Sequence, residues 1–376
     1  INTMTYSKQF KRNSGIIIFC PSIEEGGVEK NLYIISNYLS KKTNVFLVTA
    51  NKNKKNMFNK NVKFLSPKSN FWNNKTRLLK TFICFYIMLI NFYKKDVKIL
   101  SFQSNIFAII LAKTLGFKIF IRSNTSPISF ANSFIKKLIF KYFFNLSDKI
   151  IVNSKEFKNQ FYKFFNRQPV LIYNPVFDLK RLNFSSKEKI KNSFFDKNKK
   201  YLKIINVARL TKQKDHLTLL KAIKLASKKI KLKLLIIGKG KEKNKIINYI
   251  KNNKLNDTVK LLDYIKNPMP YIRHSDIFIL SSKFEGLPNV LIEAQSQKKI
   301  IIASNCPTGP SEILLNGRLG FLYKTEDYND LFKTIKYVSK NLIIAKKKAL
   351  LGFKNLKRFL PSNPKPPVIR IFFFDI

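Results

Sequence analysis

The fold is decided by one stretch of the chain, Ile277-Phe278-Ile279-Leu280-Ser281-Ser282-Lys283-Phe284-Glu285-Gly286-Leu287-Pro288-Asn289-Val290-Leu291-Ile292-Glu293-Ala294. Its first four residues form an apolar run that is typical of a buried parallel strand. Gly286 and Pro288 mark a loop, and a helix is predicted to begin at about Pro288. A strand, a loop and a helix in this order make up the repeating unit of a doubly wound α/β sheet.

The same unit recurs along the chain in two sets. The first set of predicted strands is Ile16–Cys20, Val45–Val48, Ile99–Phe102, Lys118–Arg122, Ile150–Val152 and Val170–Tyr173, and the second is Lys203–Val207, Lys233–Ile237, Val259–Leu261, Ile277–Leu280 and Ile300–Ala303. Helical stretches alternate with them, which predicts two Rossmann-like domains, each with a parallel sheet. Ligands of such sheets bind at the carboxyl ends of the strands, so we expect the two domains to face a shared cleft.

The predicted organisation has five parts. Residues 1–14 form an N-terminal extension, 15–175 the first domain, 176–200 a charged connection that follows Asn174-Pro175, and 201–357 the second domain. Residues 358–376 form an irregular tail, because its prolines exclude a helix. The abrupt change in composition there fits a frameshifted or truncated end as well as a genuine irregular tail.

Two carboxylates accompany the helix that begins near Pro288. Backbone N–H groups at a helix start bind anions, which suits a diphosphate. Glu285 precedes the helix and Glu293 lies one to two turns inside it, so about 10 Å would separate their carboxylates. One could hold hydroxyls of a transferred sugar and the other those of a ribose. The alternative is that both are solvated residues beside a helix start.

Charged residues and glycines follow other predicted strands as well. Arg209 and Lys214 follow the first strand of the second domain, where they could converge on one phosphate cluster. Alternatively, they are two basic residues among many. Three further segments that follow predicted strands contain glycines or charged residues. They are Ile236-Ile237-Gly238-Lys239-Gly240, Asn305-Cys306-Pro307-Thr308-Gly309-Pro310-Ser311-Glu312 and, in the first domain, Glu25-Gly26-Gly27-Val28-Glu29-Lys30.

Together these segments resemble the family-four retaining glycosyltransferases of the GT-B fold, over roughly residues 15–357 and most specifically over 206–323. The resemblance implies transfer of a hexose or N-acetylhexosamine from a nucleotide-diphosphate sugar to a glycan or polyprenyl-linked acceptor in cell-envelope polysaccharide synthesis. It makes the first domain the acceptor side and the second the donor side. It assigns catalytic roles to Arg209, Lys214 and Glu285, and donor binding to Glu293, Gly26, Gly27, Gly286, Leu287, Pro288, Asn289, Gly238 and Glu312.

The chain departs from the family pattern in two places. Gly238-Lys239-Gly240 replaces a common Gly-Asp-Gly, which affects contacts to the base, and the proline-rich tail replaces a returning helix. Arg122 and Asn124 follow a strand of the first domain and are our acceptor-side candidates. His216 and His274 are interpreted as structural or surface residues rather than bases.

We expect no cofactor and no metal. No Asp-x-Asp pair follows a strand, so cations and the helix start would neutralise the leaving diphosphate. The expected substrate is a nucleotide-sugar, with a UDP-sugar favoured. The three cysteines (Cys20, Cys84 and Cys306) show no CxxC spacing, and neither a disulfide framework nor a metal site is expected.

The net charge of +51 admits a rival class, a basic protein that binds nucleic acid or membrane. The lysines are spread along the chain, which also fits drift in an A+T-rich genome, and we expect no nucleic-acid partner. The segment Thr76–Lys95 is either a buried helix or an interfacial one resting on anionic lipid. We expect a cytoplasmic protein, with peripheral contact at the cytoplasmic face of the inner membrane as an open alternative, and an inactive member of the fold as another.

Overall fold

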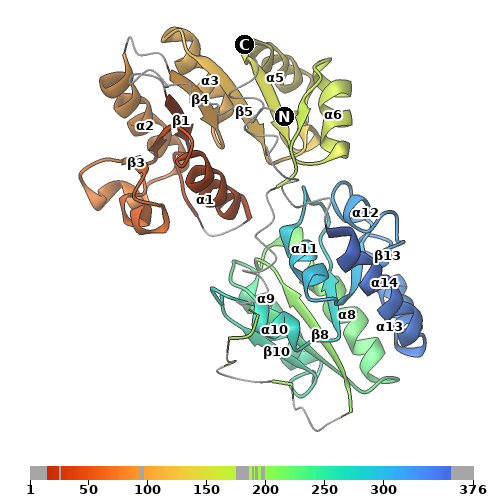
Figure 1. Cartoon of the computed structure of the whole chain (residues 1–376). Coiled ribbons are helices and arrows are strands. Elements are labelled where there is room, and N and C mark those ends of the chain that lie inside the picture. Colours follow the sequence, from red (N-terminus) through yellow and green to blue (C-terminus); the bar gives the residue numbers. More distant parts are fainter. Residues whose placement is uncertain are drawn as a thin grey trace, which may run out of the picture. The chain divides into compact units, whose positions relative to one another are not determined.

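The computed structural model describes residues 15–24, 27–93, 97–174, 186–188, 190, 194–195 and 200–356. The chain divides into two compact units, the first up to residue 175 and the second from residue 176 to residue 366. Residues 1–14 and 358–376, and most of the connection at 176–200, lie outside the described residues. Figure 1 shows the two units.

The first unit is a seven-stranded sheet in the order β3-β2-β1-β4-β5-β6-β7, and every strand pair is parallel. Its elements are β1 (Gly15–Phe19), α1 (Gly27–Leu39), β2 (Asn44–Val48), η1 (Lys52–Met57), β3 (Val62–Leu65), η2 (Asn70–Asn74), α2 (Arg77–Phe92), β4 (Val97–Ser101), α3 (Asn105–Thr114), β5 (Lys118–Ser123), α4 (Pro127–Phe130), α5 (Phe134–Leu146), β6 (Lys149–Val152), α6 (Lys155–Phe165) and β7 (Val170–Leu171).

The second unit is a six-stranded sheet in the order β10-β9-β8-β11-β12-β13, again all parallel. Its elements are β8 (Leu202–Val207), η3 (Lys212–Lys214), α8 (His216–Ser227), β9 (Leu232–Ile237), α9 (Lys243–Asn252), β10 (Val259–Leu262), α10 (Met269–Arg273), β11 (Ile277–Leu280), α11 (Asn289–Ser296), β12 (Ile300–Ser304), α12 (Pro310–Ile313), β13 (Phe321–Tyr323), α13 (Tyr328–Lys340) and α14 (Leu342–Lys354).

The two-domain α/β prediction is confirmed: both sheets have the strand order of a Rossmann fold. Each predicted strand overlaps a strand of the structure, and the bounds agree within two residues. Sequence analysis missed β3 and β13. Both are edge strands, and each buries only one residue, Val62 and Tyr323. β13 has only three residues and β3 is interrupted by Lys63, so neither gives the longer continuous apolar run that identifies a central parallel strand.

Helices cover both faces of the first sheet. Alternate residues of one strand point to opposite faces, so Ile17 and Phe19 pack with α2, α3, α5 and α6, whereas Ile16 and Ile18 pack with α1. Phenylalanines of α4, α5 and α6 contact one another in the first of these two cores. α2 therefore has one buried face, as the first interpretation of Thr76–Lys95 expected, and its opposite face is exposed.

All three cysteine thiols are free and buried. Cys20 directly follows β1 and donates weakly to the carbonyl of Ser22, and Cys84 lies in the buried face of α2. Burial raises the pKa of each thiol, that of Cys306 to about 12. The thiolate is the reactive form, so these cysteines act as small core residues.

Gly238 lets the ends of two neighbouring strands approach closely. A Cβ at this position would lie 1.9 Å from the carbonyl oxygen of Ala208. We expect Gly238→Ala to lower the free energy of unfolding by about 3 kcal/mol, since a rigid backbone cannot yield to the added methyl group. Gly317→Ala is the control: Gly317 has a φ of 88° but nothing nearer than 3.9 Å, so only backbone strain of about 1 kcal/mol is expected. Urea denaturation measures both, and equal losses would contradict the close approach.

Candidate active site

The strand order of the second sheet reverses between β8 and β11, where open α/β sheets bind their ligands. The loop after β8 carries Lys214 and the loop after β11 carries Glu285. Three hydrogen bonds join the loops: Lys283 N–H to the carbonyl of Gln213 at 2.8 Å, Gln213 Nε2 to the carbonyl of Phe284 at 2.8 Å, and Ser281 Oγ to the carbonyl of Lys214 at 2.7 Å. The switch point of the sheet is therefore built as one unit from two distant segments.

A buried ion pair lies at this junction. Lys214 Nζ donates to Glu285 Oε1 at 2.5 Å, and the two side chains are 14% and 7% exposed. Ser282 Oγ donates to the same oxygen at 2.6 Å. Among the described residues no hydrogen bond engages Glu285 Oε2. One carboxylate oxygen is thus fixed by the protein, while the other can accept a hydrogen bond from a ligand.

The helix start predicted near Pro288 is α11, which begins at Asn289. No side chain caps its first turn, although Leu287 and Asn289 have further contacts of their own. Glu293 lies in α11, is buried, and has a polar partner. The structure thus places both glutamates of the predicted pair on the segment after β11, one in the loop and one in the helix.

A second loop supports the Glu285 segment from behind. Thr308 Oγ1 donates to the carbonyl of Glu285 in a short hydrogen bond. Gly309 has a φ of 79°, and a Cβ there would lie 1.9 Å from the carbonyl oxygen of Gly286. Glu312 follows in α12, half-buried and with a partner of its own. The loop after β12 therefore packs directly against the backbone of Gly286. This close packing requires glycine at position 309, because a side chain there would collide with Gly286.

Arg209 makes no polar contact with the Lys214–Glu285 ion pair. It is exposed, and no ion pair or hydrogen bond of the described residues engages its guanidinium. The predicted meeting of Arg209 and Lys214 on one phosphate group is therefore not present as a contact in the protein alone. Lys214 instead pairs with Glu285, which sequence analysis had not connected.

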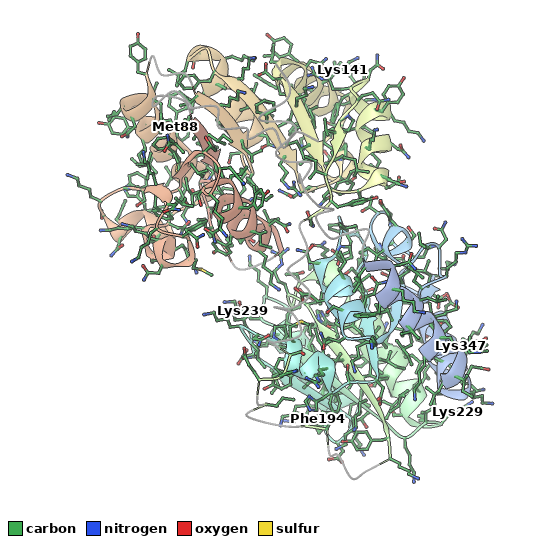
Figure 2. The ribbon with its side chains drawn as sticks, in the orientation of Figure 1. Met88, Lys141, Phe194, Lys229, Lys239 and Lys347 are labelled. Atoms are coloured by element: carbon green, nitrogen blue, oxygen red, sulfur yellow. The ribbon has the colours of Figure 1, made fainter. Side chains whose placement is uncertain are left out.

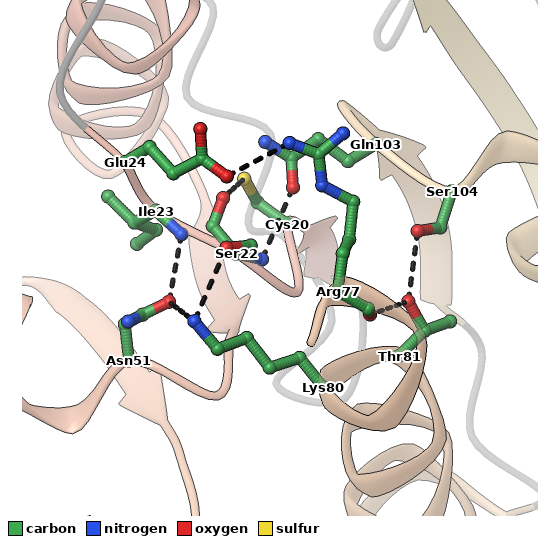
Figure 3. Close-up of polar contacts among 10 residues, drawn as sticks. All are labelled: Cys20, Ser22, Ile23, Glu24, Asn51, Arg77, Lys80, Thr81, Gln103 and Ser104. Carbon is green, nitrogen blue, oxygen red and sulfur yellow. Dashed lines mark hydrogen bonds and ion pairs between the residues drawn. The ribbon is translucent and has the colours of Figure 1, made fainter. Parts of the chain in front are cut away.

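A polar cluster occupies the corresponding switch point of the first sheet, between β1 and β4 (Figure 3). Lys80 of α2 is 6% exposed, and its Nζ lies 3.4 Å from Ser22 Oγ and 3.5 Å from Asn51 Oδ1. Burial lowers the pKa of Lys80. No carboxylate of the described residues pairs with it. Arg77, one turn earlier, pairs with Glu24 at 3.0 Å in an exposed contact.

Sequence analysis missed Lys80. Its position near the start of a predicted helix does not distinguish it from the many other lysines, although it is the charged residue on a buried face that otherwise holds Thr81, Cys84, Met88 and Phe92. The cluster around it combines one buried ammonium group with neutral oxygens. Such a site has spare positive charge and can hold an anion.

The acceptor-side candidates lie further along the same sheet edge. Arg122, at the end of β5, is 2% exposed; its Nη2 donates to Asn174 Oδ1 at 2.8 Å, and its Nε has no partner among the described residues. Burial lowers the pKa of Arg122 to about 10, which leaves it charged at neutral pH. Asn124 Nδ2 donates to the carbonyl of Phe102 at 3.4 Å. Gly27 is the first residue of α1, and Gly26 lies outside the described residues.

Neither histidine is placed as a base. His216 is buried at the start of α8, and neither ring nitrogen has a partner within the described part of the chain. His274 directly follows the short helix α10, and its Nδ1 lies 2.8 Å from the carbonyl of Pro270 in that helix. Across the described residues no group of three or more metal-ligating side chains is found.

Residues 186–349 match the model of the family described as Glycosyl transferases group 1. The chain is 35% identical over 212 residues to an uncharacterized glycosyltransferase of Methanocaldococcus jannaschii, covering 54% of this chain and 52% of that protein. It is 27% identical over 210 residues to N-acetylgalactosamine-N,N'-diacetylbacillosaminyl-diphospho-undecaprenol 4-alpha-N-acetylgalactosaminyltransferase of Campylobacter jejuni, covering 54% of each. The chain thus spans about half the length of these curated relatives.

Solved structures extend the likeness to both units. The Anabaena protein HepE, crystallised with UDP and glucose, has a TM-score of 0.73 at 14% identity, with 92% of this chain and 95% of that chain covered. At this identity the likeness concerns the fold, which is GT-B. The GT-B fold that the family resemblance implies is therefore confirmed.

The buried ring of His216 predicts a specific loss of stability in acid. Burial, assisted by the charge of Lys214, lowers the pKa of His216 to about 4 from an ordinary value of 6.5. The unfolded chain therefore binds the proton more tightly, and stability falls as pH drops from 6.5 towards 4, by about 3 kcal/mol at pH 4. His216→Leu should remove this part of the acid sensitivity. Denaturation curves at pH 7 and pH 4 measure it.

His274→Gln is the matched control, because it removes the second of the two histidines in the chain. It should leave the difference between the two pH values unchanged. If His216→Leu and the unmodified protein lose the same stability between pH 7 and pH 4, the buried neutral ring is not the cause.

Proposed function

We propose that this chain, whose second unit carries the Glycosyl transferases group 1 domain, is a retaining glycosyltransferase. It moves a hexose or N-acetylhexosamine from a nucleotide-diphosphate sugar to a glycan or lipid-linked acceptor. The observation that carries the proposal is the Lys214–Glu285 pair at the switch point of the second sheet, beside the start of α11. No cofactor or metal enters the proposal.

Three positively charged or polarised groups support the proposed binding of a nucleotide-diphosphate donor. The N–H groups of the first turn of α11 would bind the diphosphate, Lys214 supplies an ammonium group held by Glu285, and Arg209 is exposed and can approach a bound ligand. Glu285 Oε2 accepts a hydroxyl of the transferred sugar, and Glu293 holds the ribose. A nucleotide-sugar is also in keeping with the complex of HepE with UDP and glucose.

The reaction proceeds by attack of an acceptor hydroxyl on the anomeric carbon from the side that the diphosphate leaves. The new glycosidic bond forms as the bond to the phosphate oxygen breaks, so configuration is retained. A leaving phosphate oxygen takes the hydroxyl proton, which makes a separate base unnecessary. Lys214 and Arg209 stabilise the negative charge that develops on the diphosphate.

The acceptor half rests on the first unit. Lys80 is a buried ammonium with neutral partners, and it lies in the first turn of α2 at the carboxyl edge of the sheet. This chemistry favours an acceptor that carries phosphate over a neutral glycan. The Campylobacter jejuni relative is named for a diphospho-undecaprenol substrate, which supports a lipid-linked acceptor. Such an acceptor would bring the protein to the cytoplasmic face of the membrane as a peripheral partner.

Nucleotide binding should need the diphosphate and no metal. We expect UDP to raise the melting temperature in the presence of a chelator, and uridine, which lacks the diphosphate, to raise it far less. At a ligand concentration of about 100 Kd the stabilisation corresponds to about 2.7 kcal/mol. Differential scanning fluorimetry with UDP, GDP and uridine measures it and identifies the base. Stabilisation that vanishes with the chelator would contradict the metal-free site.

The two glutamates should separate into a transfer role and a binding role. Glu285→Gln should slow transfer strongly and leave UDP affinity nearly intact, because its contact with the sugar strengthens in the transition state. Glu293→Gln should weaken UDP binding by about 10- to 150-fold, the range of a lost charge-assisted hydrogen bond. Calorimetry with UDP and product formation from a UDP-sugar measure the two effects.

Glu326→Gln is the control, since Glu326 is an exposed glutamate paired with Lys283 in the same region. It should change neither property. If Glu285→Gln and Glu293→Gln transfer sugar at the unmodified rate, the carboxylates are structural and the proposal fails. UDP binding without any turnover would identify an inactive member of the fold.

A further inference from the structure

α2 has two apolar faces, and only one of them is buried in the described structure. At about 100° per residue, its buried side chains and its exposed ones occupy opposite arcs of the helix. The exposed arc contains large apolar side chains at intervals of four, Leu78, Phe82, Tyr86 and Ile90, and Ile90 is 63% exposed. Single exposed apolar residues are common on protein surfaces. A continuous exposed apolar stripe along a helix of sixteen residues instead indicates an interaction surface.

α5 also has an exposed apolar face, and a larger part of this helix is exposed than of α2. Of its thirteen residues only Phe144 is fully buried, against the phenylalanines of α4 and α6. The exposed apolar residues fall within an arc of about 140°, and they are Phe134, Ile135, Leu138, Ile139, Tyr142 and Leu146. Lys136 and Lys141 lie at the two borders of that arc. This is the pattern of a helix that lies in the plane of a membrane surface.

The two stripes belong to one layer. α2, α3 and α5 all pack on the same face of the first sheet. Phe82 of α2 contacts Phe107 of α3, with ring centroids 5.9 Å apart, and α3 packs against α5. We call the exposed apolar side chains of these three helices the outer helical face. Figure 1 shows α3 and α5 beside each other, and Figure 2 labels Met88 on α2 and Lys141 on α5.

The charges on these helices have one sign. α2, α3 and α5 contain six lysines and arginines and no aspartate or glutamate. Arg77 and Lys113 have carboxylate partners elsewhere in the unit. Lys136, Lys137 and Lys141 on α5 have none within the described part of the chain. The lysines can extend their charged ends past the apolar stripe to an anionic surface.

We propose that the outer helical face binds the surface of an anionic lipid bilayer. An apolar stripe needs an apolar partner, and the lysines beside it need negative charge; lipid tails and acidic headgroups supply both. A second copy of the chain would set lysine against lysine, since the three helices contain no carboxylate. The described residues include no helix that is long and apolar enough to cross a membrane. This contact extends the proposed function, because a lipid-linked acceptor lies in such a bilayer.

Co-sedimentation of the full chain with vesicles tests the inference. Vesicles of phosphatidylcholine with phosphatidylglycerol should bind the protein at low salt, and vesicles of phosphatidylcholine alone should bind it weakly. Ile135→Asn with Tyr142→Asn should lower the affinity by about tenfold or more, because two exposed apolar anchors are lost. Lys136→Gln with Lys141→Gln should lower it by about tenfold at low salt and have little effect at high salt.

The matched control lies on α14 of the second unit, where Ile343 is 74% exposed and Lys347 is also exposed. Ile343→Asn with Lys347→Gln makes the same kinds of change and should leave vesicle affinity unchanged. All variants should retain stabilisation by UDP, which reports on the second unit, so a failed transferase proposal is distinguishable from a failed membrane proposal. Equal losses in the control and the α5 variants would overturn the inference, and so would absent binding to anionic vesicles. A dimer in solution that the Ile135→Asn and Tyr142→Asn pair dissociates would overturn it in favour of a self-interface.

Discussion

The ion pair between Lys214 and Glu285 is the interaction on which the second unit's site depends. Two charges taken out of water are costly unless their remaining hydrogen-bonding capacity is met. Ser282 meets part of that need at Glu285, and the hydrogen bonds that surround Gln213 and Ser281 hold the two loops in place. The pair therefore requires β8 and β11 to be neighbours, which only the reversal of strand order provides.

The central strands were predictable because they are buried on both faces and read as continuous apolar runs. The run Ile277–Leu280 is a strand with the predicted bounds. The edge strand β13 has only three residues, of which two are partly buried, so it is too short to give that signal. Contacts between loops were the hardest feature to predict. The residues after each strand were identified, but nothing in their spacing indicated that Lys214 pairs with Glu285. Lys214 and Glu285 are 71 positions apart in the sequence, and the order of the strands in the sheet brings them together.

The high lysine content made individual candidate functional lysines hard to identify from the sequence. In a chain with 72 basic residues, Lys80 is indistinguishable from its neighbours until burial separates it from them. The same holds for α5, whose sequence combines apolar residues with three lysines and does not indicate which side is buried. Only the fold shows that one side of α5 packs against phenylalanines and that the other meets solvent. The charged and apolar side chains of these helices can be interpreted only once the fold shows that they lie on a common layer.

The burial of all three cysteines makes this chain convenient for spectroscopy. Their raised pKa values keep the thiols protonated, and the fold shields them from reagents. A cysteine introduced at an exposed position would therefore react with a maleimide dye or a nitroxide almost without background, with no need to remove the native residues. One label on each unit would report how the distance between the units changes when a nucleotide is added to the folded protein.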